Sequence, residues 1–248
     1  MKAAALGHDL VDAPPRTTTL ARVQAASGLA FFAFASVHFV NTMLAAVSRE
    51  LYDGFQSRAR ILYQHPIVEI ALFATLFVHI ATGVLSARRF PVVSSSGEDR
   101  DGGAQPSHRW HRYAGRALAI VILGHVAATR GPSLLAGVHP GFIGIAYTIM
   151  KWPAVSYPYF AALIACGIFH GGYGAWKAVG TLQGKGEASP LPKSPFAGRA
   201  ILVVALVLAV GLSWLGILGL GGRLYAIEDP GRSRFAVLVE GLLSHSEK

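Results

Sequence analysis

Five stretches of mostly apolar residues, each close to the length of a bilayer crossing, dominate the pattern of the chain. A transmembrane helix needs about 20 consecutive, predominantly apolar residues. Polar segments separate the stretches, and one of them, 93–107, is rich in Gly and Ser. The pattern predicts an all-α fold, a polytopic membrane bundle of five transmembrane helices placed at 21–47, 66–87, 113–129, 157–179 and 200–220.

An internal repeat relates the first two apolar stretches to the next two. Six identities recur at an offset of 87 residues, namely Gly28/Gly115, His38/His125, Gly54/Gly141, Phe55/Phe142, Ala59/Ala146 and Pro66/Pro153. Beyond the proline the offset grows by four residues, which matches His79 with His170. Each half has two spans and enters the membrane from the same side, so the first four helices are predicted to be two tandem hairpins related by a pseudo-two-fold axis along the membrane normal.

The repeat and the polar segments predict the organisation of the chain. We expect a polar N-terminal segment at 1–20, a five-span transmembrane domain at 21–222 and a polar C-terminal tail at 223–248. Within the transmembrane domain, repeat one covers 21–92, repeat two covers 108–180 and the fifth helix covers 200–220. The tail is expected to hold one short amphipathic helix near 235–243. The first two spans are expected to be joined by a charged loop that carries Arg49, Glu50, Asp53, Arg58 and Arg60.

Composition and charge agree with a membrane protein. Of the 248 residues, 52% are hydrophobic and 14% are charged, whereas about a quarter of the residues in soluble domains are charged. The net charge of +9 comes from cations that lie mostly beside the spans, without interleaved aromatics, which indicates lipid headgroup contact and no nucleic-acid partner. More of these cations flank the N-terminal side, so the N-terminus is predicted to face the cytosol. The single cysteine, Cys166, excludes a disulfide framework and a thiolate metal cluster.

Four histidines lie within the first four spans, one in each. An imidazole in hydrocarbon is costly to leave unpaired, so each is a candidate functional residue. The repeat places His38 opposite His125 and His79 opposite His170 at matched depths, about 10 Å apart along the bundle. Low-spin haem iron takes two axial imidazoles from opposite faces, so the pattern predicts one or two haem b groups with His38/His125 and His79/His170 as axial ligands. The alternatives are interhelical hydrogen bonds, and zinc, which would need further Cys, Asp or Glu ligands.

The remaining polar residues near the spans have more than one interpretation. We expect Glu69 to pair with Arg58 or Arg60, with a proton path as the alternative. Contacts with lipid headgroups are favoured over contacts with haem propionates for the cations at the two span boundaries, Arg109, Arg112, Arg116, Arg130 and Lys151. Solvated or interfacial roles are expected for the histidines assigned to loops, His65, His108, His111 and His139.

Five spans with a histidine in each of the first four resemble the dihaem cytochrome b anchor of succinate dehydrogenases and fumarate reductases. In that family the first and third haem-bearing helices share one haem, and the second and fourth share the other. The resemblance covers roughly 20–220 and concerns architecture and ligand placement. It implies electron transfer to or from quinone and partner flavoprotein and iron-sulfur subunits. Residues of that family's quinone site are not identified in this chain.

Closer local similarity is to the transmembrane domain of the Mdm-complementing protein family of mitochondrial outer-membrane proteins. It is carried by SVHFVNTML, ARILYQHPIVEIALFATLFVHIATGV and IGIAYTIMKWPAVSYPYFAALIACGIFHGGYGAWKA. This resemblance implies a role in mitochondrial lipid homeostasis, as a membrane adaptor for a bridge-like lipid-transfer protein at organelle contacts. Fungal members recruit that partner through an N-terminal Pro-x-Pro motif, from which Pro14-Pro15 departs.

Two functions from different classes therefore follow from the sequence. The first is a haem b-binding integral protein of the mitochondrial outer membrane, in contact with membrane lipids and involved in lipid homeostasis. The alternative is an electron-transferring membrane anchor of a respiratory dehydrogenase. The chain shows no catalytic nucleophile, phosphate loop or acid/base dyad, so we expect no self-sufficient enzyme and at most an electron-transfer subunit.

Overall fold

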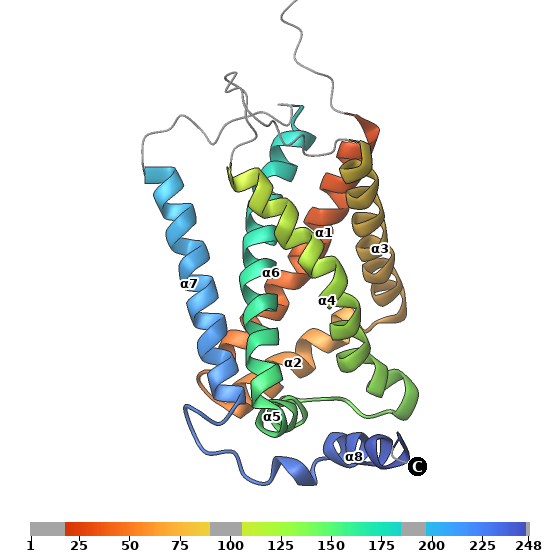
Figure 1. Ribbon diagram of the computed structural model, residues 1–248, viewed down its shortest axis with the longest axis vertical. Helices are drawn as coiled ribbons and strands as arrows, with labels where there is room; N and C mark the ends of the chain where they lie inside the picture. Colours follow the sequence, from red (N-terminus) through yellow and green to blue (C-terminus); the bar gives the residue numbers. More distant parts are fainter. Residues whose placement is uncertain (1–17, 90–105, 185–196, 247–248) are drawn as a thin grey trace, which may run out of the picture.

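The structure, a computed structural model, describes residues 18–89, 106–184 and 197–246. Pro14-Pro15 and most of the Gly- and Ser-rich segment lie outside these described residues. The described part is helical without strands, and five helices are long and apolar enough to cross a membrane, as the sequence predicts. Figure 1 shows them side by side: α1 (Thr19–Leu44), α3 (Pro66–Arg89), α4 (Pro106–Ala136), α6 (Pro153–Leu182) and α7 (Ala197–Leu220).

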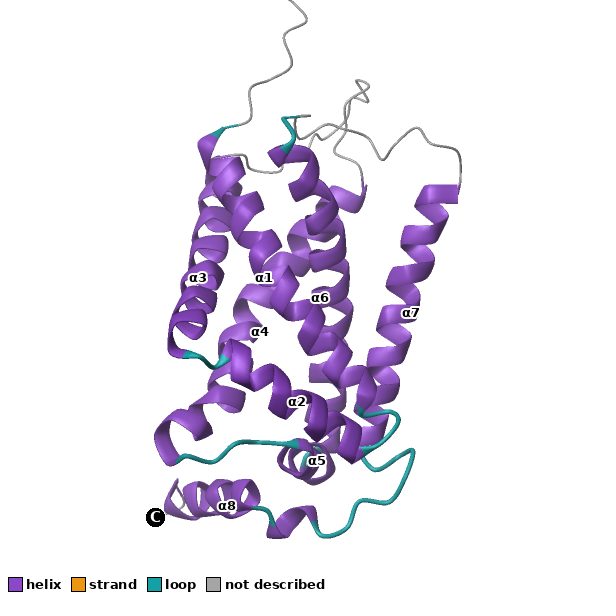
Figure 2. Ribbon diagram, turned by 180° about the vertical axis from the view of Figure 1, so that it is seen from behind, coloured by secondary structure: helices purple, strands orange, loops and turns teal. Residues whose placement is uncertain are grey.

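Three shorter helices lie at one end of the bundle (Figures 1 and 2): α2 (Arg49–Tyr63), α5 (Phe142–Lys151) and α8 (Arg234–Ser246), the last preceded by a 3-10 turn, η1 (Pro230–Arg232). The expected charged loop between the first two spans is therefore wrong. Ser48 caps α2 because its side chain accepts a hydrogen bond from the Leu51 amide, and Glu50 follows in the first turn, where a carboxylate favours the helix dipole. The α8 helix confirms the amphipathic segment expected near 235–243.

The helix α5 occupies in the second half the place that α2 occupies in the first. Three of the six matches of the repeat, Gly54/Gly141, Phe55/Phe142 and Ala59/Ala146, fall in α2 and in α5 or at its N-cap. Each repeat is therefore a span, an amphipathic helix and a second span. The amphipathic helix turns the chain back into the bundle, because only Gln64 and His65 join α2 to α3, and only Trp152 joins α5 to α6.

The repeat helices form a U in cross-section. The helices α1 and α6 pack against each other at the centre, while α3 packs on α1 and α4 packs on α6. The helix α7 contacts both α1 and α6. By contrast, α3 and α4 have little or no backbone contact with each other. The order around the U is thus α3, α1, α6 and α4, and its open side lies between α3 and α4.

The well-packed core of the protein lies at the end of the bundle that carries the short helices. There α1, α2, α5, α6 and α7 meet around a cluster of buried apolar side chains, Ala45, Tyr52, Phe142, Ala146, Ile149, Ile164, Ile168, Ile217 and Leu220. Elsewhere the long helices expose large apolar side chains, including Ile67, Ile70, Phe77, Ile120, Leu123, Ile201, Val204 and Val207. Exposed apolar surface on this scale is typical of helices that face lipid.

The fifth helix is held against α1 by two glycines that permit very close approach. A Cβ atom on Gly216 would collide with the carbonyl oxygen of Thr42, and a Cβ on Gly219 would collide with that of Ala45. Small residues at such crossings let membrane helices approach closely. After α7 the chain returns, and the Tyr225 hydroxyl donates a hydrogen bond of 2.6 Å to the Ala45 carbonyl.

We predict that α8 is held in place by the contacts of one carboxylate, that of Glu240, with α5. The Glu240 carboxylate accepts hydrogen bonds from the Lys151 ammonium and the Tyr147 hydroxyl of α5, and the Lys151 partner is the main reason that the pKa of Glu240 is lowered from 4.5. This attachment is complete above about pH 4.5 and is lost as the pH falls further, through the lowered pKa. Glu240→Gln should accelerate hydrogen exchange in 234–246 several-fold at pH 7. The control Glu228→Gln, which removes an exposed carboxylate without an ion pair, should not; equal exchange in both variants would contradict the assignment.

Candidate functional site

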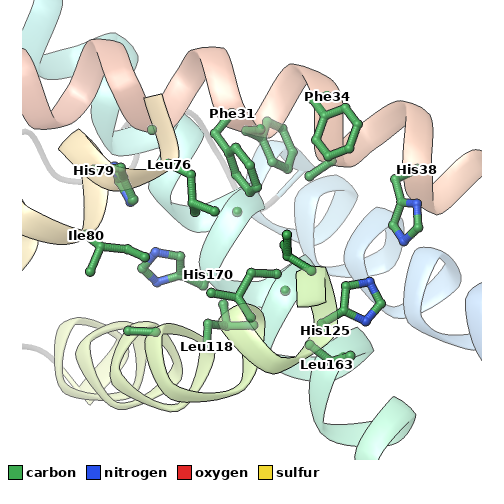
Figure 3. Close-up of a pocket in the computed structure, with 18 of the residues that line it drawn as sticks. Phe31, Phe34, His38, Leu76, His79, Ile80, Leu118, His125, Leu163 and His170 are labelled. Atoms are coloured by element: carbon green, nitrogen blue, oxygen red, sulfur yellow. The ribbon is translucent and has the colours of Figure 1, made fainter. Parts of the chain in front are cut away.

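A cavity of about 770 Å³ runs inside the U formed by α1, α3, α4 and α6. Its apolar wall includes Phe31, Phe34, Leu76, Ile80, Leu118 and Leu163 (Figure 3). One end is lined by polar side chains near the starts of α1 and α4 and the ends of α3 and α6. They include Gln24, Arg88, His108, His111, Arg112 and Lys177. The other end, beside α2, is lined by Gln56, Arg60, Tyr63, Gln64, Glu69 and Arg130. The cavity therefore has an apolar middle and two polar ends.

The four intramembrane histidines all line this cavity, one from each helix of the U, and they face one another in two pairs. The rings of His38 on α1 and His125 on α4 have centroids 5.8 Å apart and planes inclined at 69°. The rings of His79 on α3 and His170 on α6 have centroids 6.0 Å apart and planes inclined at 71°. Figure 3 shows the pairs at separate positions along the cavity. The structure thus brings together the residues that the repeat had matched.

In the second pair, a backbone carbonyl fixes the tautomer of each ring. The Nδ1 atom of His79 lies 3.2 Å from the carbonyl oxygen of Gln24, and Nδ1 of His170 lies 3.1 Å from that of His111. A carbonyl oxygen only accepts hydrogen bonds, so Nδ1 carries the proton and donates it. The Nε2 atom of each neutral ring then keeps its lone pair, which is the arrangement found in metal-binding histidines. Gln24 and His111 are themselves 87 positions apart, so both halves use the same device.

The glycine pair of the repeat makes room for these two rings. A Cβ atom built on Gly28 would lie 2.6 Å from Cε1 of His79, and one built on Gly115 would lie 2.7 Å from Cε1 of His170. Real Cβ atoms do not approach that closely, so each ring lies directly against the backbone of the neighbouring helix. Glycine recurs at both positions of the repeat because a larger residue would collide with the imidazole that packs there.

The first pair is held differently. Nδ1 of His125 lies 3.2 Å from the hydroxyl of Tyr159, and the ring of His38 stacks on Phe34 with centroids 6.3 Å apart. A hydroxyl both donates and accepts, so this contact orients the His125 ring without fixing its tautomer. The repeat has no second tyrosine to match Tyr159, since Val68 and Leu72 occupy the two equivalent positions. The two pairs are alike in spacing and unlike in their supports.

The spacing within each pair fits a metal bound between two imidazoles. Metal–imidazole bonds of about 2 Å, with each bonding nitrogen about 1.1 Å from its ring centroid, place two opposed centroids about 6 Å apart. In the described part of the chain, no three or more His, Cys, Asp or Glu residues are grouped as a metal site. Two protein ligands per site suit an iron porphyrin, which brings its own four equatorial nitrogens, better than they suit a zinc ion.

The two pairs are further apart than the expected 10 Å. Gly28 marks the level of the His79 ring on α1, and His38 lies ten residues further along the same helix. At a rise of about 1.5 Å per residue, this separation is about 15 Å. Gly115 and His125 give the same spacing on α4. The predicted separation of about 10 Å combines distances counted from the ends of two different spans. The contact of His79 with Gly28 instead allows the positions of both histidine pairs to be compared along one helix, α1.

His111 is a site residue that sequence reasoning missed. The sequence predicts a loop at this position, but α4 begins at Pro106, so His111 lies on the helix. Its ring stacks on that of His170, with centroids 4.3 Å apart and planes inclined at 8°, and its Nε2 atom is buried without a hydrogen-bond partner. The repeat indicates that His111 is helical, because the matching residue, Gln24, lies within the first predicted span.

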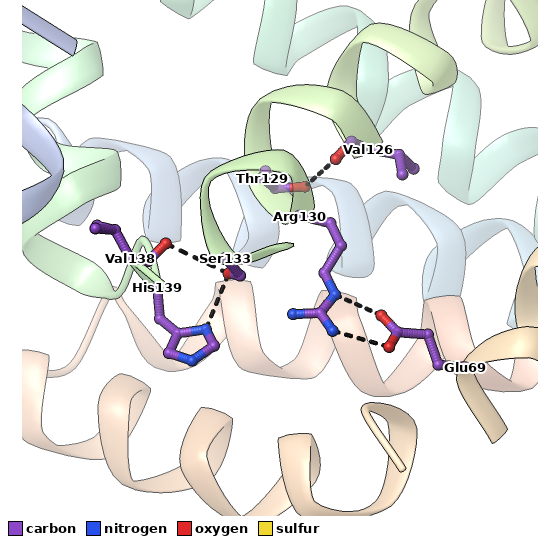
Figure 4. A network of polar contacts seen from close by, with 7 residues as sticks. All are labelled: Glu69, Val126, Thr129, Arg130, Ser133, Val138 and His139. Carbon is purple, nitrogen blue, oxygen red and sulfur yellow. Dashed lines mark hydrogen bonds and ion pairs between the residues drawn. The ribbon is translucent and has the colours of Figure 1, made fainter. Parts of the chain in front are cut away.

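The expected partner of Glu69 is also wrong. Its carboxylate pairs with Arg130 across the open side of the U, through Nε and through Nη2, the latter at 2.8 Å (Figure 4). The two side chains are only 18% and 19% exposed. Neither Arg58 nor Arg60 takes this role. The pair joins residues 61 positions apart, so local spacing could not reveal it.

No protein family, curated protein or solved structure matches this chain. The class of the protein therefore follows from its own geometry. The chain is a helical bundle with five potential membrane spans and an internal cavity that carries two facing pairs of histidines.

We predict that the two glycines are required for binding at the second pair. Gly28→Ala and Gly115→Ala should each push the facing imidazole out of place and lower haem bound per protein by about half, because the His38/His125 pair is untouched. Gly124→Ala is the matched control, since Gly124 adjoins His125 on α4 and a Cβ there meets nothing within 4 Å. The measurement is reduced-minus-oxidised absorbance per mole of protein. Equal haem content in all three variants would contradict this account of the glycines.

Proposed function

We propose that the protein is an integral membrane protein that binds two b-type haems, one between His38 and His125 and one between His79 and His170. The observation that carries the proposal is a hydrogen bond that occurs once in each repeat: Nδ1 of His79 donates to the carbonyl of Gln24, and Nδ1 of His170 donates to the carbonyl of His111. Each of these carbonyls lies 14 residues before a histidine of the other pair, His38 and His125 respectively. An isolated interhelical hydrogen bond would need only one such ring. Two facing rings, each with Nδ1 engaged and a lone pair left on Nε2, support shared ligation.

The residues of the chain would hold the cofactor in a form suited to electron exchange. Bound haem supplies a reversible one-electron iron couple. The facing rings of His38 and His125, and those of His79 and His170, would hold the group from both sides, so a substrate would find no free place on it. The apolar cavity wall keeps water from the rings, and the backbone carbonyls that accept from Nδ1 raise the basicity of His79 and His170. Two sites about 15 Å apart along the bundle would lie at different depths of a bilayer.

For the cellular role, we propose a haem-bearing protein of the mitochondrial outer membrane that supports lipid homeostasis as an adaptor. The resemblance of 36–44, 59–84 and 143–178 to the Mdm-complementing protein family supports this role. A cytosolic N-terminus is supported by Arg88, Arg112, Arg116 and Lys177, which lie near the end of the bundle where α1 begins. The second candidate is a respiratory membrane anchor, and the observation in its favour is the presence of two histidine pairs at two depths.

The ligand assignment predicts which variants share a phenotype. His38→Ala and His125→Ala should each remove the same haem signal, and His79→Ala and His170→Ala should each remove the other, because both rings of a pair bind one iron. Redox titration of the purified variants, followed in the visible bands, measures the loss. A shared loss in His38→Ala and His79→Ala would show that the pairs are wrongly assigned.

The two cellular roles are separated by their partners. If the adaptor role is right, purification in mild detergent should recover no stoichiometric flavoprotein or iron-sulfur subunit, and cells lacking the gene should retain succinate-driven quinone reduction while their mitochondrial lipids change. Recovery of both subunits together with loss of that activity would favour the respiratory anchor. The His79→Ala variant is a useful second bait, since loss of one haem should leave adaptor contacts unchanged.

A further inference from the structure

The polar end of the cavity beside α2 contains polar and charged side chains that haem ligation by the four histidines does not use. They come from the end of α2, the start of α3 and the lower part of α4: Arg60, Tyr63, Gln64, Glu69 and Arg130. Ring contacts place them next to the first histidine pair. The Tyr63 ring packs edge-on against Phe34 at 5.4 Å, and Phe34 stacks on His38.

The charges that line this end of the cavity do not balance. Glu69 is engaged by two nitrogens of Arg130, and Arg60 adds a second guanidinium group, so these three lining side chains carry a formal net charge of +1. Arg60 takes part in none of the ion pairs among the described residues. Its Nη2 donates a hydrogen bond of 3.1 Å to the carbonyl of Pro140, and its Nε is buried without a partner. Arg60 is half-buried, and a partly buried cation without an ion-pair partner favours a nearby anion.

A neighbouring group responds to this excess of positive charge. His139 lies in the connection between α4 and α5. Its pKa is lowered from 6.5, first by burial and then by the positive charges of Arg60 and Arg130. Both arginines therefore act on the same small region. An anion between them would gain from both charges.

The side of the cavity between α3 and α4 has little backbone packing. Because α3 and α4 do not pack on each other, the Glu69–Arg130 pair is the polar link that spans the open side of the U at this end. Leu72 and Phe73 of α3, with Ile122 and Val126 of α4, continue this wall of the cavity with apolar side chains. A ligand with an apolar body and an acidic group suits this combination.

We propose that Arg60 and Arg130 form an oxyanion site that holds the carboxylate of an apolar ligand occupying the cavity beside His38 and His125. Two sources share this chemistry, a propionate of the haem at that pair and the head of a free long-chain carboxylate from the bilayer. The first source rests on the proposed function, while the second does not. A planar guanidinium offers a carboxylate two parallel hydrogen bonds, which an ammonium does not, so arginine is well suited to this task.

The test compares acids with their esters on the full-length protein purified without haem. Arg60→Gln should weaken binding of one acid about tenfold and leave its ester unchanged, because only the acid carries the charge. Haem and haem dimethyl ester form the first arm, followed in the Soret band. A fluorescent long-chain fatty acid and its methyl ester form the second. Arg58→Gln, on the exposed side of the same helix, is the matched control and should change neither arm.

Two more variants keep the proposal open to refutation if Arg60→Gln folds poorly. Glu69→Gln removes the carboxylate that neutralises Arg130, so it should tighten binding of the same acid. Arg60→Lys keeps the charge and should lose only part of the affinity. A response confined to haem assigns the propionate, and a response confined to the fatty acid assigns the bilayer ligand.

The outcomes also separate this site from the proposed function. If the wild-type protein forms no bis-imidazole haem complex, haem binding fails, and the fatty-acid arm still decides the oxyanion site. If Arg60→Gln and Glu69→Gln bind both acids as the wild type does, the oxyanion site is overturned, whatever the haem content.

Discussion

The hydrogen bond between a histidine ring and a carbonyl of the neighbouring helix is the constraint on which the rest of the site depends. In a bilayer, neither an imidazole N–H nor an extra carbonyl lone pair has water to satisfy it. His79 and His170 meet this requirement by donating from Nδ1 to Gln24 and His111. The contact requires the ring to lie against the helix backbone, which is why glycine stands at positions 28 and 115. It also leaves the lone pair on Nε2 of both rings, which line the cavity.

The same constraint explains why the bundle can keep a cavity at all. The paired helices α1/α3 and α4/α6 are fastened by these ring contacts and by backbone packing, while α3 and α4 stay apart. Stability comes from elsewhere, namely the core where α2, α5 and α7 close one end around Tyr52, Phe142 and Ile217. Separating the packed core from the cavity leaves the space lined by the histidines open without removing the contacts that hold the helices.

Much of this arrangement could be predicted because it follows from length, apolarity and duplication. The five spans and the two histidine pairs depend on local pattern and on one offset. The helix α2 was not predicted because its many charged residues, which include Arg49 and Asp53, are typical of a loop. The structure shows that one face of this segment is buried as a helix. The Glu69–Arg130 pair depends on how α3 and α4 approach, which no local pattern encodes. His111 was missed because α4 extends beyond its apolar run, and its polar first turns line the cavity end.

The most direct test of two bis-imidazole haem sites is electron paramagnetic resonance of the oxidised, purified protein, combined with a count of haem per chain. Imidazole planes inclined at 69° and 71° would make two d orbitals of a bound iron nearly equal in energy, so the ferric signal should be low-spin and highly anisotropic. The account predicts two haems per chain, both with this signal. A protein purified from haem-replete cells that carries no haem, or only high-spin haem with a single histidine ligand, would contradict it.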